Sequence, residues 1–271
     1  MSPSFPNSES PLPLSIEQDG SLRIGAAASI ADIASSGMVR AHYPMLASAC
    51  AQGESTLSIA GDLLQPPRCS YLRRGVPCLK NGGSGCPAHD GENHDLAILD
   101  GGPCWIVNAS DAAIALVALD AEIRITGPGG SRAVAAADFF VIPRERMDRE
   151  TVLVEGEHIH EVRLPAAAAG GLQRYTRLVE PGSTKAPIVS LAMARRADGE
   201  ARLVLGGVSP RPYRIYTSVE EEAVSGGLDE DTIAGLAERA LLDAEPLSRN
   251  GFKVELAASL LRDAIRDIDS A

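Results

Sequence analysis

Residues 58–104 form a stretch that glycine and proline interrupt repeatedly and that holds four of the chain's five cysteines. These four are Cys69, Cys78, Cys86 and Cys104. Neither a helical nor a strand period persists over residues 69–91. So long an irregular segment is uncommon in a compact domain unless it binds something or is disordered. The sequence therefore predicts that the four thiols hold a metal centre.

The spacing of the cysteines favours one kind of centre. Eight, seven and seventeen residues separate successive cysteines, so the short C-x2-4-C knuckles typical of structural zinc are missing. Thiolates select zinc or iron–sulfur centres, and a 4Fe–4S cube takes four of them at widely spread corners. We therefore expect the cysteines to suit a 4Fe–4S cluster better than zinc.

The same loop contains cations and glycines that suit such a cluster. The cations that would offset its negative charge are Lys80, Arg73 and Arg74. The glycines that would let backbone amides approach the sulfides are Gly82, Gly83 and Gly85.

Other interpretations of the cysteines remain open from the sequence alone. The thiols could form two disulfides, stay free in a mobile loop, or bind zinc as a staple. A nucleophilic cysteine with His89 or His94 as its base is disfavoured, because reactive cysteines normally stand alone beside their base. Cys50 lies on a predicted helix among small apolar residues, so we interpret it as a buried structural thiol and not as a ligand.

Length, charge and composition narrow the function classes. A chain of 271 residues with 45% hydrophobic residues can bury one large core or two ordinary ones. Its net charge of −11, without a basic stripe, argues against partners that are nucleic acid or an anionic membrane surface. Five cysteines fit a reducing compartment. With neither a signal-peptide pattern nor an apolar run of membrane-spanning length, the expected location is the cytoplasm.

Periodicity and turn signals predict both strands and helices in the first half. The expected elements are a strand at 22–28, a helix at 30–34 capped by Ser29, a helix at 38–52, a strand at 105–107, a helix beginning at Ser110 and Asp111, a hairpin over 121–134, and two strands within 151–164. Residues 165–171 are low in complexity and form the best candidate domain boundary.

The second half reads as strands followed by paired helices, which predicts a small α+β domain. Its expected elements are strands at 173–178 and 201–208, a segment at 187–195 that could be helix or strand, and helices through 233–241 and 256–268. We interpret two sets of polar residues as structural and not as parts of a site. His158 and His160 share a strand face and are expected to be solvated, because a third ligand is missing nearby. The carboxylates of Glu220, Glu221 and Glu222 are expected on a solvated surface.

Several motifs together resemble the flavoprotein (medium) subunit of molybdenum hydroxylases, the xanthine dehydrogenase and carbon monoxide dehydrogenase family. They are SIAGDLLQPPRC, GGSGCPAHDGEN, AILDGGPC and SDAAIALVALDAEI, with RLVLGGVSPRPYR and LSRNGFKVELAASLLRDAI resembling the C-terminal domain of these subunits. Within the family the chain is similar to the branch that inserts a 4Fe–4S loop, which includes periplasmic aldehyde oxidoreductases and 4-hydroxybenzoyl-CoA reductases.

This resemblance implies an α+β fold in which a truncated FAD-binding (PCMH-like) α/β subdomain precedes a small C-terminal α+β domain. The implied division is a disordered terminus at 1–13, an FAD-binding-type subdomain at 14–165 with an iron–sulfur loop at 66–104, and a C-terminal domain at 166–271 of the carbon monoxide dehydrogenase flavoprotein type. The four loop cysteines fall on the family's cluster ligands. The flavin-facing motif falls on Ser58, Ile59, Ala60, Gly61 and Asp62.

The departures from the family pattern bear on FAD. The N-terminal subdomain with its A-G-G-T-x-L loop, whose amides would cradle the FAD pyrophosphate, is not found in this sequence. In the second motif, usually T-x-G-G-N-L, Ala60 adds a methyl group and Asp62 places a negative charge near an anionic cofactor. We therefore expect the isolated chain to bind FAD weakly or not at all.

The resemblance further implies an electron-transfer subunit that carries a 4Fe–4S cluster and conditionally FAD. Its partners would be a large molybdopterin-binding subunit and a small 2Fe–2S subunit, and catalytic residues for substrate chemistry would lie outside this chain. Two alternatives are a non-catalytic scaffold or assembly subunit stapled by a metal centre, and a zinc-stapled binding module.

Overall fold

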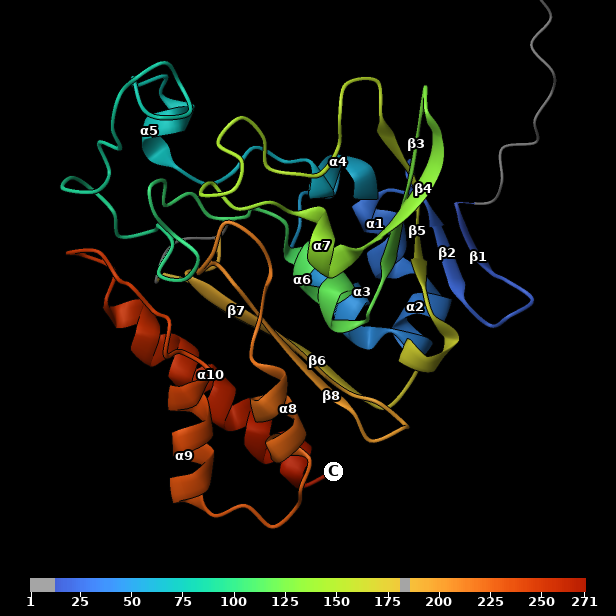
Figure 1. The fold of residues 1–271 in the computed structure, drawn as a ribbon. Helices are drawn as coiled ribbons and strands as arrows, with labels where there is room; N and C mark the ends of the chain where they lie inside the picture. The colour runs from blue at the N-terminus through green and yellow to red at the C-terminus, as the bar shows by residue number, and fades with distance from the viewer. Residues whose placement is uncertain (1–12, 181–185) are drawn as a thin grey trace, which may run out of the picture.

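The computed structural model of the chain describes residues 13–180 and 186–271. The predicted disordered terminus at 1–13 lies outside the described residues except for its last position. The described part contains two antiparallel sheets with helices around them (Figure 1). The predicted α+β fold class is therefore confirmed.

The first sheet has the strand order β1-β2-β5-β3-β4. Its strands are β1 (Leu14–Ile16), β2 (Leu22–Gly25), β3 (Glu122–Gly127), β4 (Gly130–Ala135) and β5 (His158–Leu164). Strands β3 and β4 form the hairpin predicted from the GPGG turn, with Gly127 opposite Gly130. His158 and His160 are exposed on β5, as expected for solvated residues.

Four short helices follow β2, and the first of them begins at Ile30 as predicted. They are α1 (Ile30–Ser35), α2 (Gly37–His42), α3 (Pro44–Cys50) and α4 (Ile59–Leu63). The Ser29 side chain caps α1 by accepting a hydrogen bond from the N–H of Asp32 at 3.0 Å. The predicted single helix at 38–52 is wrong, since Pro44 begins a new helix at its first position. Proline lacks an N–H and disfavours helical geometry in the residue before it, so the chain breaks at Tyr43.

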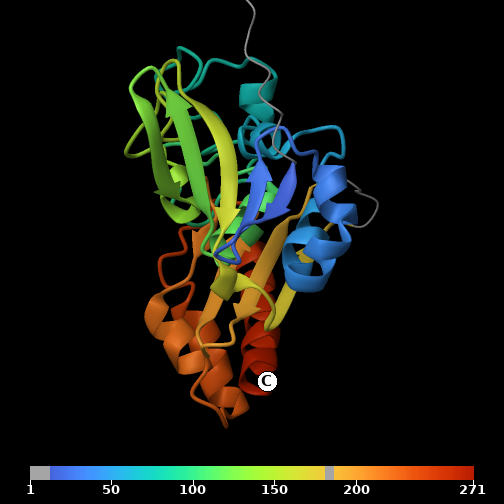
Figure 2. The same ribbon diagram turned by 90° about the vertical axis from the view of Figure 1, so that its right-hand side faces the viewer.

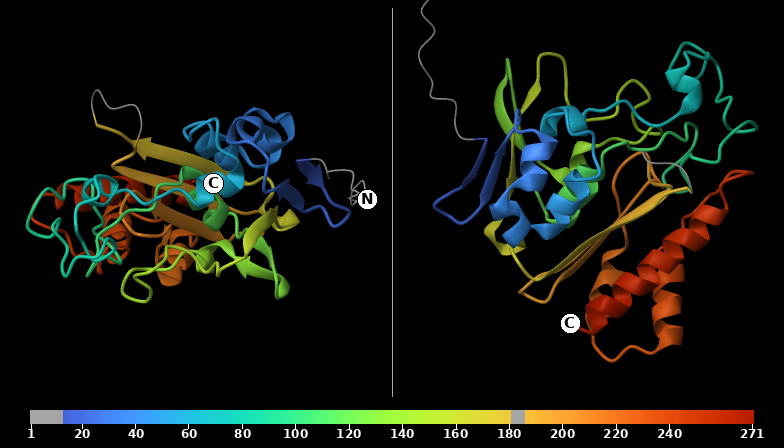
Figure 3. Two further views of the ribbon diagram at one scale, coloured as in Figure 1. Left: turned by 90° about the horizontal axis from the view of Figure 1, so that it is seen from above. Right: turned by 180° about the vertical axis from the view of Figure 1, so that it is seen from behind.

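The second sheet has the strand order β6-β7-β8-β9. The segment 187–195, which the sequence left undecided between helix and strand, forms strand β7. The strands of this sheet are β6 (Leu172–Leu178), β7 (Val189–Arg195), β8 (Ala201–Gly206) and β9 (Tyr213–Arg214). All residues of β7 before Arg195 are buried. Helix α10 (Phe252–Asp269) covers one face of this sheet, and α3 with α6 (Asp111–Ala118) covers the other (Figures 2 and 3). Burial on both faces explains why β7 is continuously apolar and not alternating.

Two predicted strands are absent as strands. Within residues 105–107 only Val107 pairs, in an isolated bridge with Arg68. Within residues 151–154 only Thr151 pairs, in an isolated bridge with Phe140. Their apolar residues are explained by burial, since Ile106 and Val107 are buried and Val152 and Leu153 pack against the first core. Neither segment has a neighbouring strand along its whole length, and a ladder needs one.

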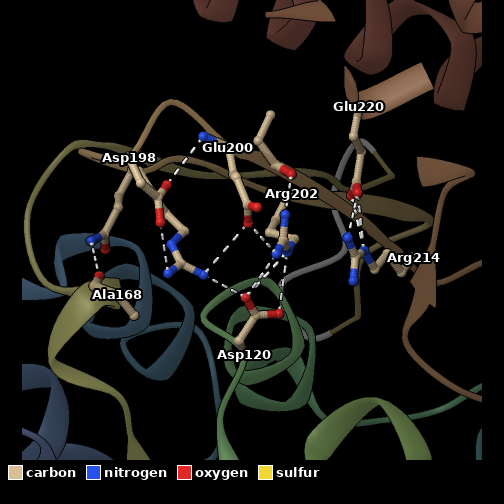
Figure 4. A network of polar contacts seen from close by, with 10 residues as sticks. Asp120, Ala168, Asp198, Glu200, Arg202, Arg214 and Glu220 are labelled. Atoms are coloured by element: carbon tan, nitrogen blue, oxygen red, sulfur yellow. Dashed lines mark hydrogen bonds and ion pairs between the residues drawn. The ribbon is translucent and has the colours of Figure 1, made fainter. Parts of the chain in front are cut away.

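The turn between α6 and β3 is tied to the second sheet through a charged cluster (Figure 4). The carboxylate of Asp120, a non-glycine residue with φ of 51°, accepts from Arg196 Nη1 at 2.8 Å and from Arg202 Nε at 3.2 Å. Both arginines flank the turn between β7 and β8. The cluster therefore fixes the second sheet against the end of α6.

The expectation that residues 220–222 form a solvated surface is wrong for Glu220. This residue lies on α8 (Thr217–Ala223) and is 2% exposed. Its carboxylate accepts from the N–H of Leu203 at 2.9 Å and from Arg214 at 2.6 Å (Figure 4). Helix α8 packs on β8, so one of the three carboxylates must face the sheet, where these two donors satisfy it.

We predict that Glu220→Ala lowers the free energy of unfolding by about 2–3 kcal/mol, because it leaves a buried N–H and a half-buried guanidinium without their acceptor. The control is Glu221→Ala, which removes an exposed carboxylate from the same helix and should leave stability unchanged. Urea unfolding of both variants measures the difference. Equal stability of the two variants would contradict a structural role for Glu220.

Candidate functional site

The four cysteines of the loop line one cavity, although they are spread over 36 positions of the chain. Cys69 precedes the short helix α5 (Ser70–Arg73), Cys78 and Cys86 lie in irregular turns, and Cys104 precedes the segment that pairs with Arg68. Cys78 is 7% exposed and Cys104 is 6% exposed. All four are free thiols, so the disulfide alternative is not what the structure shows.

The remaining walls of this cavity are largely apolar. They include Leu72, Ala88, Leu96, Trp105 and Ile106. Lys80 also lines it, and its Nζ donates to the carbonyl of Met147 and to the carboxylate of Glu150, each at 2.8 Å. The predicted cation is therefore at the cavity, with part of its charge balanced by Glu150. Arg73 and Arg74, the other two predicted cations, bond to backbone carbonyls of their own segment and do not line it.

Two of the three predicted loop glycines have a structural reason to be glycine. A Cβ at Gly83 would lie 2.7 Å from the backbone nitrogen of Cys78, and Gly82 has a φ of +71°. Gly85 has neither constraint. The sequence interpretation missed Gly101, where a Cβ would lie 2.4 Å from the indole of Trp105. The backbone thus approaches the cysteine cavity closely at more than one point.

Burial raises the pKa of the Cys104 thiol to about 11, and the nearby sulfurs of Cys86 and Cys69 add to the increase. An N–H of Ile106 and the Lys80 ammonium act in the opposite direction. These influences agree with the convergence of the thiols on one space. Cys50 is 2% exposed on α3, and burial raises its pKa strongly, as expected of a structural thiol.

Within the described residues, His, Cys, Asp and Glu side chains form no group of three or more arranged to hold a metal ion. Neither His89 nor His94 lines the cysteine cavity. His89 contacts Asp90 at 2.7 Å, and His94 contacts Asp95 at 2.9 Å. The geometry therefore offers no support for a cysteine nucleophile with a histidine base.

The predicted flavin-facing stretch forms the start of α4. Ser58 caps this helix, with its Oγ accepting from the N–H of Gly61 at 3.1 Å. Asp62 is 1% exposed, and its carboxylate accepts from Gln65 Nε2 at 2.7 Å and from the hydroxyl of Ser110. Asp62 points into the interior and lines a second pocket, which is separate from the cysteine cavity.

This second pocket, which we name the Asp62 pocket, is lined by Asp62 and by other charged residues that the sequence interpretation did not assign to a site. Asp111 and Arg68 line it together with Asp62 and Glu54. Arg68 Nη2 donates to the carbonyl of Ala109 at 2.9 Å and lies 4.0 Å from the Asp111 carboxylate. The sequence showed Asp111 only as a helix-start residue, and Arg68 only as the neighbour of Cys69.

Burial raises the pKa of Asp62 to about 6, the hydroxyl of Ser110 opposes this, and the Asp111 carboxylate adds to it. Burial also raises the pKa of Asp111, against the influence of Arg68 and Arg177. Two carboxylates and one guanidinium therefore share a weakly solvated space.

The side chains that line the Asp62 pocket fit only part of a flavin nucleotide. Carboxylates accept hydrogen bonds from hydroxyl groups, so Asp111 suits a polyhydroxylated chain, whereas both oxygens of Asp62 already accept from Gln65 and Ser110. A diphosphate would instead face Asp62, Asp111 and Glu54 with Arg68 as the lining cation. The residues of this pocket fit the hydroxyl-bearing part of FAD and do not fit its diphosphate.

Comparison with known proteins decides the family. The family described as "FAD binding domain in molybdopterin dehydrogenase" matches residues 14–167. The chain belongs to this family. It is 33% identical to the aldehyde oxidoreductase FAD-binding subunit PaoB of Escherichia coli (strain K12) over 263 residues, 94% of this chain and 80% of that protein. The glyceraldehyde dehydrogenase medium chain of Sulfolobus acidocaldarius is 29% identical over 168 residues, 59% of this chain and 57% of that one.

Solved structures of other proteins have the same fold. Carbon monoxide dehydrogenase from Hydrogenophaga pseudoflava superposes with a TM-score of 0.62 at 22% identity, over 93% of this chain and 76% of that chain. The reconstituted CO dehydrogenase from Oligotropha carboxidovorans gives 0.64 at 17% identity, over 95% and 78%. The family match and the identity with PaoB confirm the predicted resemblance to the flavoprotein subunit. In the described part of the chain, every helix is too short or too polar to cross a membrane.

We predict that Asp62 makes the stability of the protein fall as the pH rises from 4 to 7. The pKa of Asp62 is about 6 in the folded protein and 3.8 for an ordinary aspartate. Its protonation therefore stabilises the folded state fully below pH 4, and this contribution is lost as the pH rises through about 6. Asp62→Asn should remove up to about 3 kcal/mol of this dependence. Unfolding free energies at pH 4 and pH 7 measure it, with Asp32→Asn on α1, an exposed carboxylate, as the control. An unchanged pH dependence in Asp62→Asn would contradict the burial argument.

Proposed function

We propose that this chain is the electron-relaying medium subunit of a molybdenum-dependent oxidoreductase and that it carries a 4Fe–4S cluster on Cys69, Cys78, Cys86 and Cys104. The observation that carries the proposal is the convergence of these four thiols, distant in sequence, on one apolar cavity. Membership of the FAD-binding family places the chain among oxidoreductase subunits.

The chemistry of the cavity supports a cluster. Thiolates are the usual ligands of iron–sulfur centres, and the four thiolates of a cube bind four different irons, so they need not converge as closely as the ligands of one ion. When bound, such a cluster takes up and releases single electrons. The residues of this chain hold the thiols in place, exclude water through apolar walls such as Leu96 and Ile106, and place the Lys80 ammonium beside the ligands.

We propose that the Asp62 pocket takes the flavin. Asp111 accepts hydrogen bonds from the hydroxyl-bearing chain of FAD, the diphosphate lies outside the pocket, and the buried charge of Asp62 weakens the binding of this anionic cofactor. Arg68 lines this pocket and directly precedes Cys69 in the sequence. Flavin and cluster would therefore stand on opposite sides of one residue, which suits electron transfer between them.

The partners in this proposal are a large molybdopterin-binding subunit and a small 2Fe–2S subunit. PaoB is named as the FAD-binding subunit of an aldehyde oxidoreductase, which supports partner chains for this protein. In this proposal, residues 14–165 and 166–271 are the two domains, substrate chemistry takes place on a partner subunit, and the complex works in the cytoplasm.

A scaffold or assembly subunit is the second candidate, because the cysteine loop contacts both halves of the chain. Arg68 pairs with Val107 of the first half, and residues 98–99 pack into the second core. In that case a metal centre would only staple the fold. Turnover of the assembled complex with Cys78→Ser separates the two candidates. If the cluster relays electrons, this variant loses turnover; if the metal centre only staples the fold, it keeps turnover as long as the complex still forms.

We predict that the purified chain contains about four irons and about four acid-labile sulfides, and that Cys78→Ala loses most of both. The matched control is Cys50→Ala, which removes a buried thiol outside the cavity and should keep the wild-type content. Iron and sulfide analysis with a visible spectrum measures this. One zinc in place of iron would support the zinc-stapled module, and equal metal loss in both variants would contradict the assignment of the ligands.

We also predict that the double variant Ala60→Gly with Asp62→Asn binds FAD about tenfold more tightly than the wild type. It removes a negative charge from a buried pocket and a methyl group from the start of α4, and about 1.4 kcal/mol corresponds to a factor of ten. Fluorescence titration with FAD measures the dissociation constant, with Asp32→Asn as the charge-matched control. An unchanged or weaker affinity in the double variant would place the flavin elsewhere.

A further inference from the structure

We propose that Lys253, with Asn250 and Asn93, positions one wall of the cysteine cavity by fastening the loop segment 93–99 to the C-terminal half of the chain. These three residues lie outside the cysteine cavity and outside the Asp62 pocket. The relevance of this role to a cluster rests on the proposed function. The structural role itself can be tested without a cluster.

Lys253 lies in the first turn of α10 and is 1% exposed. Its Nζ donates to the carbonyl oxygens of Asp95 at 3.0 Å, Leu96 at 2.9 Å and Gly207 at 2.7 Å. The three donors of the ammonium are therefore all used by backbone carbonyls. Two of these carbonyls belong to the cysteine loop, and the third follows strand β8. One buried cation thus joins the loop, the sheet and the helix.

Asn250 reinforces the same attachment from the residues just before α10. It is fully buried, and its Nδ2 donates to the carbonyls of Leu96 at 3.1 Å and Ala97 at 3.2 Å. Its Oδ1 accepts from the N–H of Leu247 at 2.7 Å, which fixes the side chain in this orientation. The carbonyl of Leu96 is therefore held by both Asn250 and Lys253.

Asn93 completes the attachment from the loop side and is also fully buried. Its Oδ1 accepts from the N–H of Arg249 at 3.0 Å, and its Nδ2 donates to Ser248 Oγ and to the carbonyl of Ala88, both at 3.2 Å. The contact with Ala88 reaches a residue that lines the cysteine cavity, two positions after Cys86.

The attached segment carries part of the cavity wall. Leu96, whose carbonyl Lys253 holds, lines the cavity itself. Directly after it, the N–H groups of Ile98 and Leu99 donate to the carbonyl of Val208 at 2.8 and 3.0 Å. The N-terminal end of α10 accordingly lies beside this loop in the view from behind (Figure 3). The N–H of Ala97 donates to the carbonyl of Trp105, the residue after Cys104, at 3.1 Å. The side of the cavity bearing Cys86 and Cys104 therefore depends on the C-terminal half, whereas Cys69 follows Arg68, which pairs with Val107.

Removing the ammonium should loosen this wall specifically. Lys253→Met keeps a long buried side chain at this position of α10. It leaves the carbonyls of Asp95 and Gly207 without the Lys253 donor and the carbonyl of Leu96 with Asn250 alone. Buried acceptors without partners are unfavourable, so the segment that can reach water will move toward it. Strand β8 is held by hydrogen bonds to its neighbouring strands and α10 by its intrahelical hydrogen bonds. The loop segment 93–99 lies in neither a helix nor a strand, so it has no such set of hydrogen bonds.

Hydrogen exchange followed by mass spectrometry on the full chain tests this directly. In Lys253→Met we expect the amides of residues 93–99 to exchange at least about tenfold faster, and iodoacetamide to modify Cys104 faster, while α10 and β7 keep wild-type rates. The control is Arg266→Met on the same helix, which removes an exposed cation paired with Glu230 and should change neither readout.

Two results would overturn the proposal. Unchanged exchange at 93–99 would show that the ammonium does not hold the segment, and equal acceleration in α10 and β7 would show that Lys253 supports the whole C-terminal half. If Lys253→Met does not fold, Asn93→Ala removes the loop-side contact without altering α10, and the same local acceleration is expected. Iron content decides the proposed function, and exchange at 93–99 decides this proposal, so each can fail without the other.

Discussion

The second sheet must be covered on both of its faces, and the rest of the structure follows from this requirement. Strand β7 is buried on both sides, so α10 alone cannot shield it. Helices α3 and α6 from the first half supply the other cover. The fit is close at Gly206, where a Cβ would lie 1.9 Å from Ile114 of α6. The two halves of the chain therefore form one packed body, although each has its own sheet.

The cysteine loop lies where these two halves meet. One end of it is fixed by the pairing of Arg68 with Val107, and its far side is fixed to the C-terminal half through residues 93–99. A loop attached at both ends to packed structure can hold four side chains around one cavity without regular secondary structure of its own. The Asp62 pocket adjoins the same place through Arg68, so the two candidate cofactor sites are neighbours.

Local signals in the sequence were reliable where a single interaction decides the structure. The caps at Ser29 and Ser110 and the hairpin over Gly127–Gly130 were all predicted, because each depends on residues close in sequence. Predictions failed where tertiary packing decides. Pro44 divides a helix whose apolar period runs on, and Glu220 is buried although its neighbour Glu221 is exposed. The apolar run at 187–195 is a strand because both of its faces are covered.

By itself, the sequence determined the family, the α+β class and the set of four cysteines, because motifs and residue types are properties of the chain. It could not place Lys253, Asn250 and Asn93 around one loop, nor show that Asp62 shares a pocket with Asp111 and Arg68. Lys253 and Leu96 are 157 positions apart, and only the packing of α10 beside the second sheet brings them within 2.9 Å. Such contacts depend on how the elements are stacked, which residue spacing does not encode.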